Sequence, residues 1–307
     1  MTTIRRLPLA ALVAAAAAGV TAAPAAALAP CARTFTPRPI VTGTDKFESA
    51  LVDRDGRLLY TSRDRNALMV IDQRGQEPRV LAGGITDPGG IALDAQGRII
   101  VGFGNSVPNG QSPALGLAGL YRVDPRTGGK RVLTRGLAMA NGVVRGTDGT
   151  IYASDDFAAV LDRVTPRGTV NRGWAKPLNP NGLALDPNGR WLYANLSFAP
   201  TKIVRIDRRN PRAITTYADP GVADANAFLD GLTIDSTRTL YAAAFGAGQV
   251  WRIDASRKPC VLARGLAQTT SVAVGRGARG FGRGNLYVTG YDGRIVELRG
   301  AATGKAT

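Results

Sequence analysis

The sequence predicts an all-β fold, a six-bladed β-propeller with an N-terminal strand that closes the last blade. One pattern recurs six times: a short apolar strand, an Asp-x-x-Gly-like turn and a second strand with a Leu-Tyr-like pair. The repeats begin 40 to 52 residues apart, the spacing of propeller blades of three or four strands. No long helical periodicity follows the N-terminal region. Because a ring buries every blade between two neighbours, whereas a linear stack exposes apolar faces at its ends, we expect a closed ring.

The strands are predicted from runs of β-branched and aromatic residues that Gly, Asp, Asn and Pro bound on both sides. The second strands are expected around Leu58–Tyr60, Ile99–Val101, Ile151–Ala153, Trp191–Tyr193, Leu240–Ala242 and Leu286–Val288. A third strand follows in each repeat, for example over Leu120–Asp124, Ile203–Asp207 and Val250–Asp254.

The two ends of the chain are expected to meet in the last blade. The sixth repeat ends soon after Leu298 and lacks a clear fourth strand, which residues 36–42 are apolar enough to supply. Cys31 and Cys260 are the only cysteines. In an exported chain one disulfide is the first expectation, with two unpaired thiols as the alternative. Such a bond would reinforce ring closure, because Cys260 falls in the outer part of the fifth blade.

Residues 1–29 have the composition of a secretory signal peptide. Arg5 and Arg6 precede an apolar run from Leu7 to Val20, and Ala-rich sequence follows. The run is too short for a membrane span, and no other stretch is long and apolar enough. We therefore expect a secreted, extracellular protein with its propeller over residues 30–300 and a short C-terminal tail over residues 301–307.

Charge and composition narrow the partners and the chemistry. The net charge is +16, but the arginines are scattered without interleaved aromatic residues, so no nucleic-acid partner is expected. A solvated basic surface is the first interpretation, and electrostatic contact with an anionic cell envelope is the alternative. Histidine is absent, which excludes histidine bases, Ser-His-Asp triads and histidine-ligated zinc. A monomer that acts on a small-molecule substrate is expected.

Oxygen-bearing side chains recur at one position, five residues before the turn, where each first strand begins. The residues at this position are Glu48, Gly89, Asn141, Asn181, Asp230 and Thr270. Blades arranged around an axis bring this position to one place. Carboxylate and amide oxygens suit a hard cation. We therefore predict that one divalent cation, with calcium as the first candidate, binds Glu48, Asn141, Asn181 and Asp230. Gly89 and Thr270 are expected to leave space for water or substrate.

Three further segments are expected near this face. Asp155 and Asp156 end the second strand of the third repeat, and a role in the turn is favoured over contact with the site. Insertions over residues 104–119 and 219–228 are predicted to project from the same face. They are candidates for a rim over the site, with solvated loops as the alternative.

The chain resembles the six-bladed propeller family of gluconolactonase, senescence marker protein (regucalcin) and luciferin-regenerating enzyme. The resemblance covers residues 38–299 and depends on motifs around the repeated position: Phe47-Glu48, Asn141-Gly142, the run Asn181–Asp186 and the run Leu229–Leu232. It implies that Glu48, Asn181 and Asp230 bind the cation directly, and that Asn141 binds the cation, a water or the substrate.

One departure from the family concerns the substrate. Lactonases of this family often carry an arginine two residues before the third-blade asparagine and an aspartate after it. Met139 and Gly142 stand there in this chain. A sugar-acid lactone would therefore lose a charge partner.

The predicted function is metal-dependent hydrolysis of a small lactone or ester. A bound cation would polarise the carbonyl, and Asp230 is the first candidate for the carboxylate that activates water. Phosphotriesterase-like hydrolysis on the same centre is one alternative. A non-catalytic extracellular propeller that binds a ligand is another. Condensation chemistry of the strictosidine synthase type is a third, but it does not explain the two asparagines.

Overall fold

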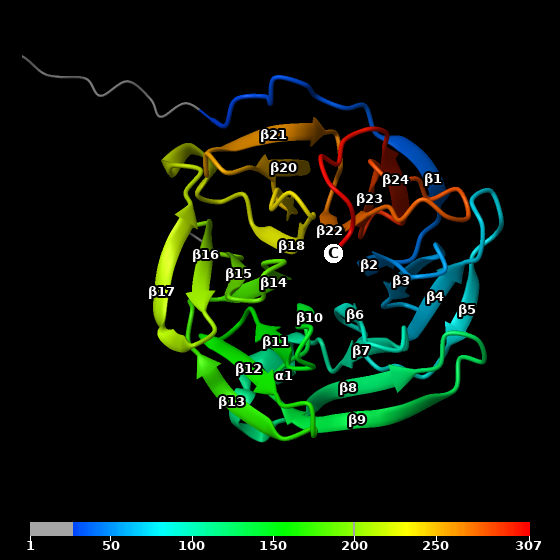
Figure 1. Ribbon diagram of the computed structural model, residues 1–307, viewed down its shortest axis with the longest axis vertical. Coiled ribbons are helices and arrows are strands. Elements are labelled where there is room, and N and C mark those ends of the chain that lie inside the picture. The colour runs from blue at the N-terminus through cyan, green and yellow to red at the C-terminus, as the bar shows by residue number, and fades with distance from the viewer. Residues whose placement is uncertain (1–26, 199) are drawn as a thin grey trace, which may run out of the picture.

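The computed structural model describes residues 27–198 and 200–307 and shows six blades around a central axis (Figure 1). Each blade is a four-stranded antiparallel sheet whose first strand lies next to the axis. This confirms the predicted fold. Most of the predicted signal peptide, residues 1–26, lies outside the described residues. No helix in the described part of the chain is long and apolar enough to cross a membrane.

The first three blades follow one another along the chain. Blade one comprises β2 (Phe47–Val52), β3 (Leu58–Ser62), β4 (Ala67–Ile71) and β5 (Arg79–Ala82). Blade two comprises β6 (Ile91–Leu93), β7 (Ile99–Phe103), β8 (Ala118–Val123) and β9 (Lys130–Leu137). Blade three comprises β10 (Val143–Arg145), β11 (Ile151–Asp155), β12 (Val160–Val164) and β13 (Val170–Ala175).

The other three blades complete the ring. Blade four comprises β14 (Pro180–Leu185), β15 (Trp191–Leu196), β16 (Lys202–Asp207) and β17 (Asn210–Ala218). Blade five comprises β18 (Leu229–Ile234), β19 (Leu240–Ala244), β20 (Gln249–Ile253) and β21 (Pro259–Arg264). Blade six comprises β22 (Thr269–Val274), β23 (Leu286–Gly290), β24 (Arg294–Leu298) and β1 (Arg38–Thr42).

The apolar core lies between adjacent blades rather than within one. One buried cluster, for example, joins Leu59 and Leu68 of blade one to Ile99 and Val101 of blade two. Alternate residues of each strand face opposite neighbours, so both faces of every sheet are covered. Each blade therefore depends on the next one, and the ring has no free face.

The hairpins that join first and second strands owe their shape to the repeated Asp-x-x-Gly motif. The Asp53 carboxylate accepts the backbone N–H of Arg57 at 2.8 Å. Gly56 adopts a φ of 81°, which glycine reaches without the steric cost that a Cβ adds. The turn fixes the register of the two strands that it joins. The repeated site position therefore falls at the same level along the axis in several blades.

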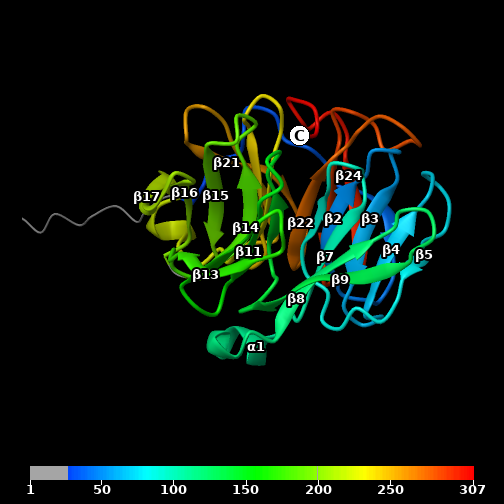
Figure 2. The same cartoon turned by 60° about the horizontal axis from the view of Figure 1, so that its bottom comes forward.

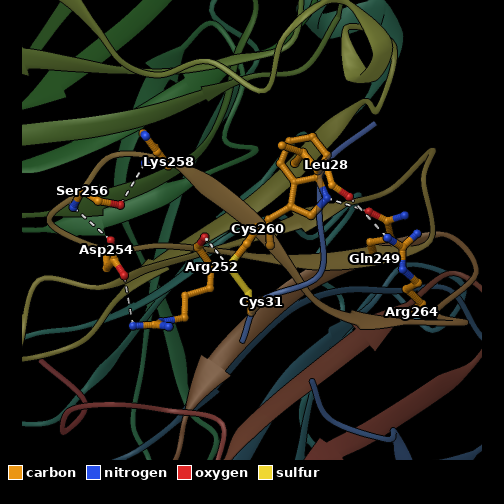
Figure 3. The surroundings of a disulfide bond; sticks show 10 residues. Leu28, Cys31, Gln249, Arg252, Asp254, Ser256, Lys258, Cys260 and Arg264 are labelled. Atoms are coloured by element: carbon orange, nitrogen blue, oxygen red, sulfur yellow. Dashed lines mark hydrogen bonds and ion pairs between the residues drawn. A yellow bond between two sulfur atoms is a disulfide. The ribbon is translucent and has the colours of Figure 1, made fainter. Parts of the chain in front are cut away.

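The N-terminal strand closes the last blade, as predicted. β1 pairs with β24 in the antiparallel direction. Before it, the chain runs beside β21, where the N–H of Cys31 donates to the carbonyl of Val261 at 2.9 Å. Cys31 and Cys260 form a disulfide, which confirms the predicted pairing (Figure 3).

Both predicted insertions leave the face on which the first strands begin. Residues 104–119 carry the short helix α1 (Val107–Gln111) and the 3-10 turn η1 (Pro113–Leu115). Figure 2 shows α1 projecting from the face opposite the C-terminus. A Cβ on Gly110 would lie within 3.0 Å of Met139 and Phe157, so α1 packs against blade three. The second insertion carries η2 (Val222–Asp224).

Candidate functional site

The four predicted site residues line one channel along the axis. Its volume is about 550 Å³, and Glu48, Asn141, Asn181 and Asp230 all contribute to its wall. They lie where first strands begin. The opposite end, where first strands finish, is lined instead by arginines, namely Arg54, Arg145 and Arg276. The ring therefore brings the predicted residues together at one mouth of the channel.

A β-bulge positions three of these side chains. The pairing of first and second strands shifts register between Phe47 and Ala50, between Pro180 and Leu183, and between Leu229 and Leu232. Glu48, Asn181 and Asp230 lie inside these three bulges. A bulge re-aims side chains and is common beside functional sites. The same local distortion in three blades thus brings their polar side chains to the channel wall.

Asp156 joins the predicted residues as a third carboxylate. Asn141 donates from Nδ2 to its Oδ1 at 3.0 Å, and Asn181 donates from Nδ2 to its Oδ2 at 3.4 Å. The turn role that was predicted for both aspartates therefore holds only for Asp155, whose carboxylate accepts the N–H of Phe157 at 3.0 Å. Asp156 instead fixes the orientation of two predicted cation ligands. We refer to Glu48, Asp156 and Asp230 as the acidic centre.

Glu48 has two partners that the sequence did not reveal. The hydroxyl of Tyr291 donates to Glu48 Oε2. Arg63 Nη1 lies 3.7 Å from the same oxygen and donates to the carbonyl of Asn105 at 2.8 Å. Arg63, Asp156 and Tyr291 each directly follow a second strand. A comparison of the repeats at that position, as well as at the first-strand position, would have found all three.

The acidic centre holds more negative than positive charge. Burial, followed by the charges of Glu48 and Asp156, raises the pKa of Asp230 well above its usual value. Burial also raises the pKa of Asp156 to about 6, against the hydrogen bond from Asn141. Arg63 supplies the positive charge nearest Glu48. Without a further cation, the centre therefore favours protonated carboxyl groups.

The carboxylate and amide oxygens of the four predicted ligands are of the kind that bind a hard divalent cation. No three carboxylate, cysteine or histidine side chains within residues 27–198 and 200–307 form a ready group for a metal ion. A cation here would therefore need amide oxygens as well as carboxylates, as calcium sites commonly use. Asn141 and Asn181 direct their amide nitrogens to Asp156, which leaves their oxygens for another partner. Two positive charges would also offset the excess negative charge of the centre.

Gly89 does not leave space for water or substrate, so that part of the expectation is wrong, whereas Thr270 lines the channel. A Cβ on Gly89 would lie 1.9 Å from the carbonyl oxygen of Ala140. Gly89 is therefore required by close contact between blades two and three. Thr270 donates from Oγ1 to the carbonyl of Phe47 at 2.6 Å and links blade six to blade one.

Comparison with known proteins agrees with the resemblance seen in the sequence. Residues 153–291 match the model of the family described as SMP-30/Gluconolactonase/LRE-like region, which confirms the resemblance. The matched span extends from β11 of blade three to the end of the second strand of blade six. No curated protein is detectably similar in sequence.

Solved structures share the fold at low sequence identity. A gluconolactonase from Xanthomonas campestris superimposes with a TM-score of 0.70 at 18% identity, over 91% of this chain and 99% of its own. The calcium-binding protein regucalcin from Agrobacterium tumefaciens gives 0.68 at 16% identity, over 87% and 94%. Luciferin-regenerating enzyme gives 0.67 at 15% identity, over 89% and 98%. At these identities the similarity establishes the fold.

Proposed function

We propose that this protein is a secreted hydrolase of a small lactone or ester that depends on a divalent cation, with calcium as the first candidate. The observation that carries the proposal is the acidic centre at one mouth of the channel, with two asparagines bonded to one of its carboxylates. Similarity to the gluconolactonase and regucalcin folds supports it. We assign the cation to Glu48, Asn141, Asn181 and Asp230.

The residues of the acidic centre and their neighbours would have different roles in the reaction. When bound, the cation would polarise the substrate carbonyl and stabilise negative charge on its oxygen. Asp230 takes the proton of the attacking water, because it is a carboxylate on the channel wall at the proposed cation site. Asp156 orients Asn141 and Asn181, and Tyr291 and Arg63 hold Glu48 in place.

Cation binding is tested without any substrate. Calcium added to chelator-treated protein should raise the melting temperature, and elemental analysis of the purified protein should find about one divalent ion per chain. Glu48→Gln should weaken the calcium response at least tenfold. Asp219→Asn is the matched control, because Asp219 is exposed and pairs with Lys202 away from the channel. An equal response in both variants would remove Glu48 from the site.

Hydrolysis is tested with a panel of lactones, aryl esters and phosphotriesters, assayed with calcium and with chelator. Turnover of lactones or esters that chelator abolishes would support the proposal, and turnover of phosphotriesters alone would favour the phosphotriesterase alternative. Asp230→Asn should lower kcat by at least a hundredfold while the melting temperature stays within a few degrees. A bound cation without turnover of any substrate would instead indicate a non-catalytic ligand-binding propeller.

Secretion is tested by the mature N-terminus. Mass spectrometry of the protein recovered from the culture medium should find a chain that begins after the Ala-rich segment. Recovery of the full-length chain from the cytosol alone would contradict this part of the proposal.

A further inference from the structure

Five aromatic side chains lie beside the acidic centre in two groups, Phe157, Phe198 and Phe228 in one and Phe245 and Tyr291 in the other, and we call them together the aromatic arc. We infer that this aromatic arc binds an aromatic or bulky apolar group of the substrate, so that the preferred substrates are aryl or apolar esters and lactones rather than sugar lactones. The inference rests on the proposed function for the reaction, but the arc is defined by its own contacts.

The rings are connected in pairs. The centroids of Phe157 and Phe198 are 5.7 Å apart, and those of Phe198 and Phe228 are 6.1 Å apart. The N–H of Phe245 donates to the carbonyl of Phe228 at 2.9 Å. The Phe245 ring then lies 5.7 Å from that of Tyr291. The trio from blades three to five and the pair from blades five and six are thus joined by a backbone bond within blade five.

Three residues of the arc are tied to the acidic centre, two by their place in the sequence and one by a hydrogen bond. Phe157 directly follows Asp156, and Phe228 lies two residues before Asp230. At the far end, the Tyr291 hydroxyl donates to Glu48. A substrate group lying on these rings would therefore place the rest of the molecule at the carboxylates.

None of the five rings is fully buried, and Phe228 is 41% exposed. Large apolar side chains that gather on one partly open surface are costly to leave in water. Rings that line a core would be covered on all sides, whereas these keep one side available. This is the arrangement of a binding wall, in which a ligand completes the burial.

Phe228 is the clearest evidence that the arc is not a by-product of packing. The residue two places before the repeated site position adopts a left-handed conformation in four blades, with φ of 45° at Asp87, 47° at Asn179, 50° at Phe228 and 52° at Gln268. Asp and Asn tolerate this region, but an aromatic residue there is a strained exception. Gly246 gives the ring room, because a Cβ on it would lie 2.6 Å from Phe228 Cδ2. A strained backbone thus holds an exposed ring next to the site.

The remaining part of the mouth is polar. Blades one and two contribute Arg63 and Asp87, and Arg63 lies 3.7 Å from Glu48 and 3.8 Å from Asp87. The site is therefore two-sided, with rings from blades three to six and a charged side from blades one and two. A sugar would need hydrogen-bond partners along its whole ring, and the arc offers only the Tyr291 hydroxyl, which is already bonded to Glu48.

The inference is tested by binding as well as by turnover. The probe is 4-nitroacetanilide, an amide analogue of 4-nitrophenyl acetate, titrated by calorimetry into the full chain with saturating calcium. Phe228→Asn keeps the left-handed turn that blade four makes with Asn179 and removes only the ring. Phe198→Ala removes a second ring, and Gln268→Asn at the equivalent position of blade six is the matched control. We expect each ring variant to weaken binding about tenfold and the control to leave it unchanged.

The turnover arm compares kcat/KM for 4-nitrophenyl acetate with that for γ-butyrolactone. The ring variants should lower the first about tenfold and leave the second within twofold. Probe binding that is absent from the wild type, or equal in all variants, would overturn the arc even if lactones are hydrolysed. Ring-dependent binding without hydrolysis of any ester or lactone would uphold the arc and refute the proposed function.

Discussion

The disulfide between Cys31 and Cys260 should account for a large part of the stability of the ring. It joins residues 229 apart in sequence, and so it closes almost the whole propeller into one loop. On the chain-entropy relation, a loop of this length lowers the entropy of the unfolded chain by about 18 cal/mol/K, or about 5 kcal/mol at 25 °C. Figure 3 shows the bond between the N-terminal segment and β21 of blade five.

The folded state should change little when the bond is removed, because backbone bonds already hold the segment. Val261 donates its N–H to Ala29 at 2.9 Å, and Phe35 donates to Leu262 at 3.0 Å. The stability loss should therefore arise mainly in the unfolded state, as a lower free energy of unfolding with an intact native spectrum.

The assay is urea unfolding of the wild type and of the double variant Cys31→Ser with Cys260→Ser, each followed by circular dichroism and fluorescence. We expect the double variant to lose about 4 to 5 kcal/mol. A reductant should destabilise the wild type and leave the double variant unchanged, which separates the bond from the substitutions. A loss below about 1 kcal/mol would refute the loop-closure reasoning.

Three further predictions concern the centre, the C-terminal tail and the contact between blades. The pKa of Asp156 is raised to about 6 in the folded protein, so its ionisation lowers the free energy of unfolding as pH rises from about 4 through 6. Asp156→Asn should therefore raise the melting temperature of chelator-treated protein at pH 8 but not at pH 4. Asp235 accepts a hydrogen bond from Oγ1 of Thr303 in the C-terminal tail at 2.8 Å. Burial raises the pKa of Asp235, but hydrogen bonds, first from Thr237 and then from Thr303, outweigh it and hold the pKa below 3.8. Asp235→Asn should cost about 2 kcal/mol at pH 7, and the difference from the wild type should shrink as pH falls through 3.8 in urea titrations. Gly89→Ala should destabilise the protein by about 3 kcal/mol or more in the same titrations, because its Cβ would meet a carbonyl at 1.9 Å, whereas Gly43→Ala, whose nearest atom would be 3.8 Å away, should be close to neutral.

One position in the repeat was enough to predict four residues of the site. Glu48, Asn141, Asn181 and Asp230 could be found because they share a place in the repeat, and symmetry converts a shared place into spatial proximity. Gly89 shares the same place, but the expectation that it leaves space for water or substrate is wrong. Its meaning depends on a carbonyl of the next blade, which no pattern in its own blade reveals.

Other residues could not be found from the same pattern, because their roles depend on contacts between blades. Asp156 reaches the asparagines of its own and the next blade, and Tyr291 of blade six reaches Glu48 of blade one across the closure of the ring. The aromatic arc likewise forms only when four blades are placed side by side.

The sequence by itself determined the blade, the number of blades, the closing strand and the cysteine pair, because strand patterning and turn chemistry are local and repeat along the chain. Only the tertiary structure decided which further side chains join those four at the mouth of the channel and how all of them are bonded. The physical reason is that hydrogen bonds and charge interactions act over a few ångströms, and such distances between blades are fixed by packing around the axis rather than by neighbours in the chain.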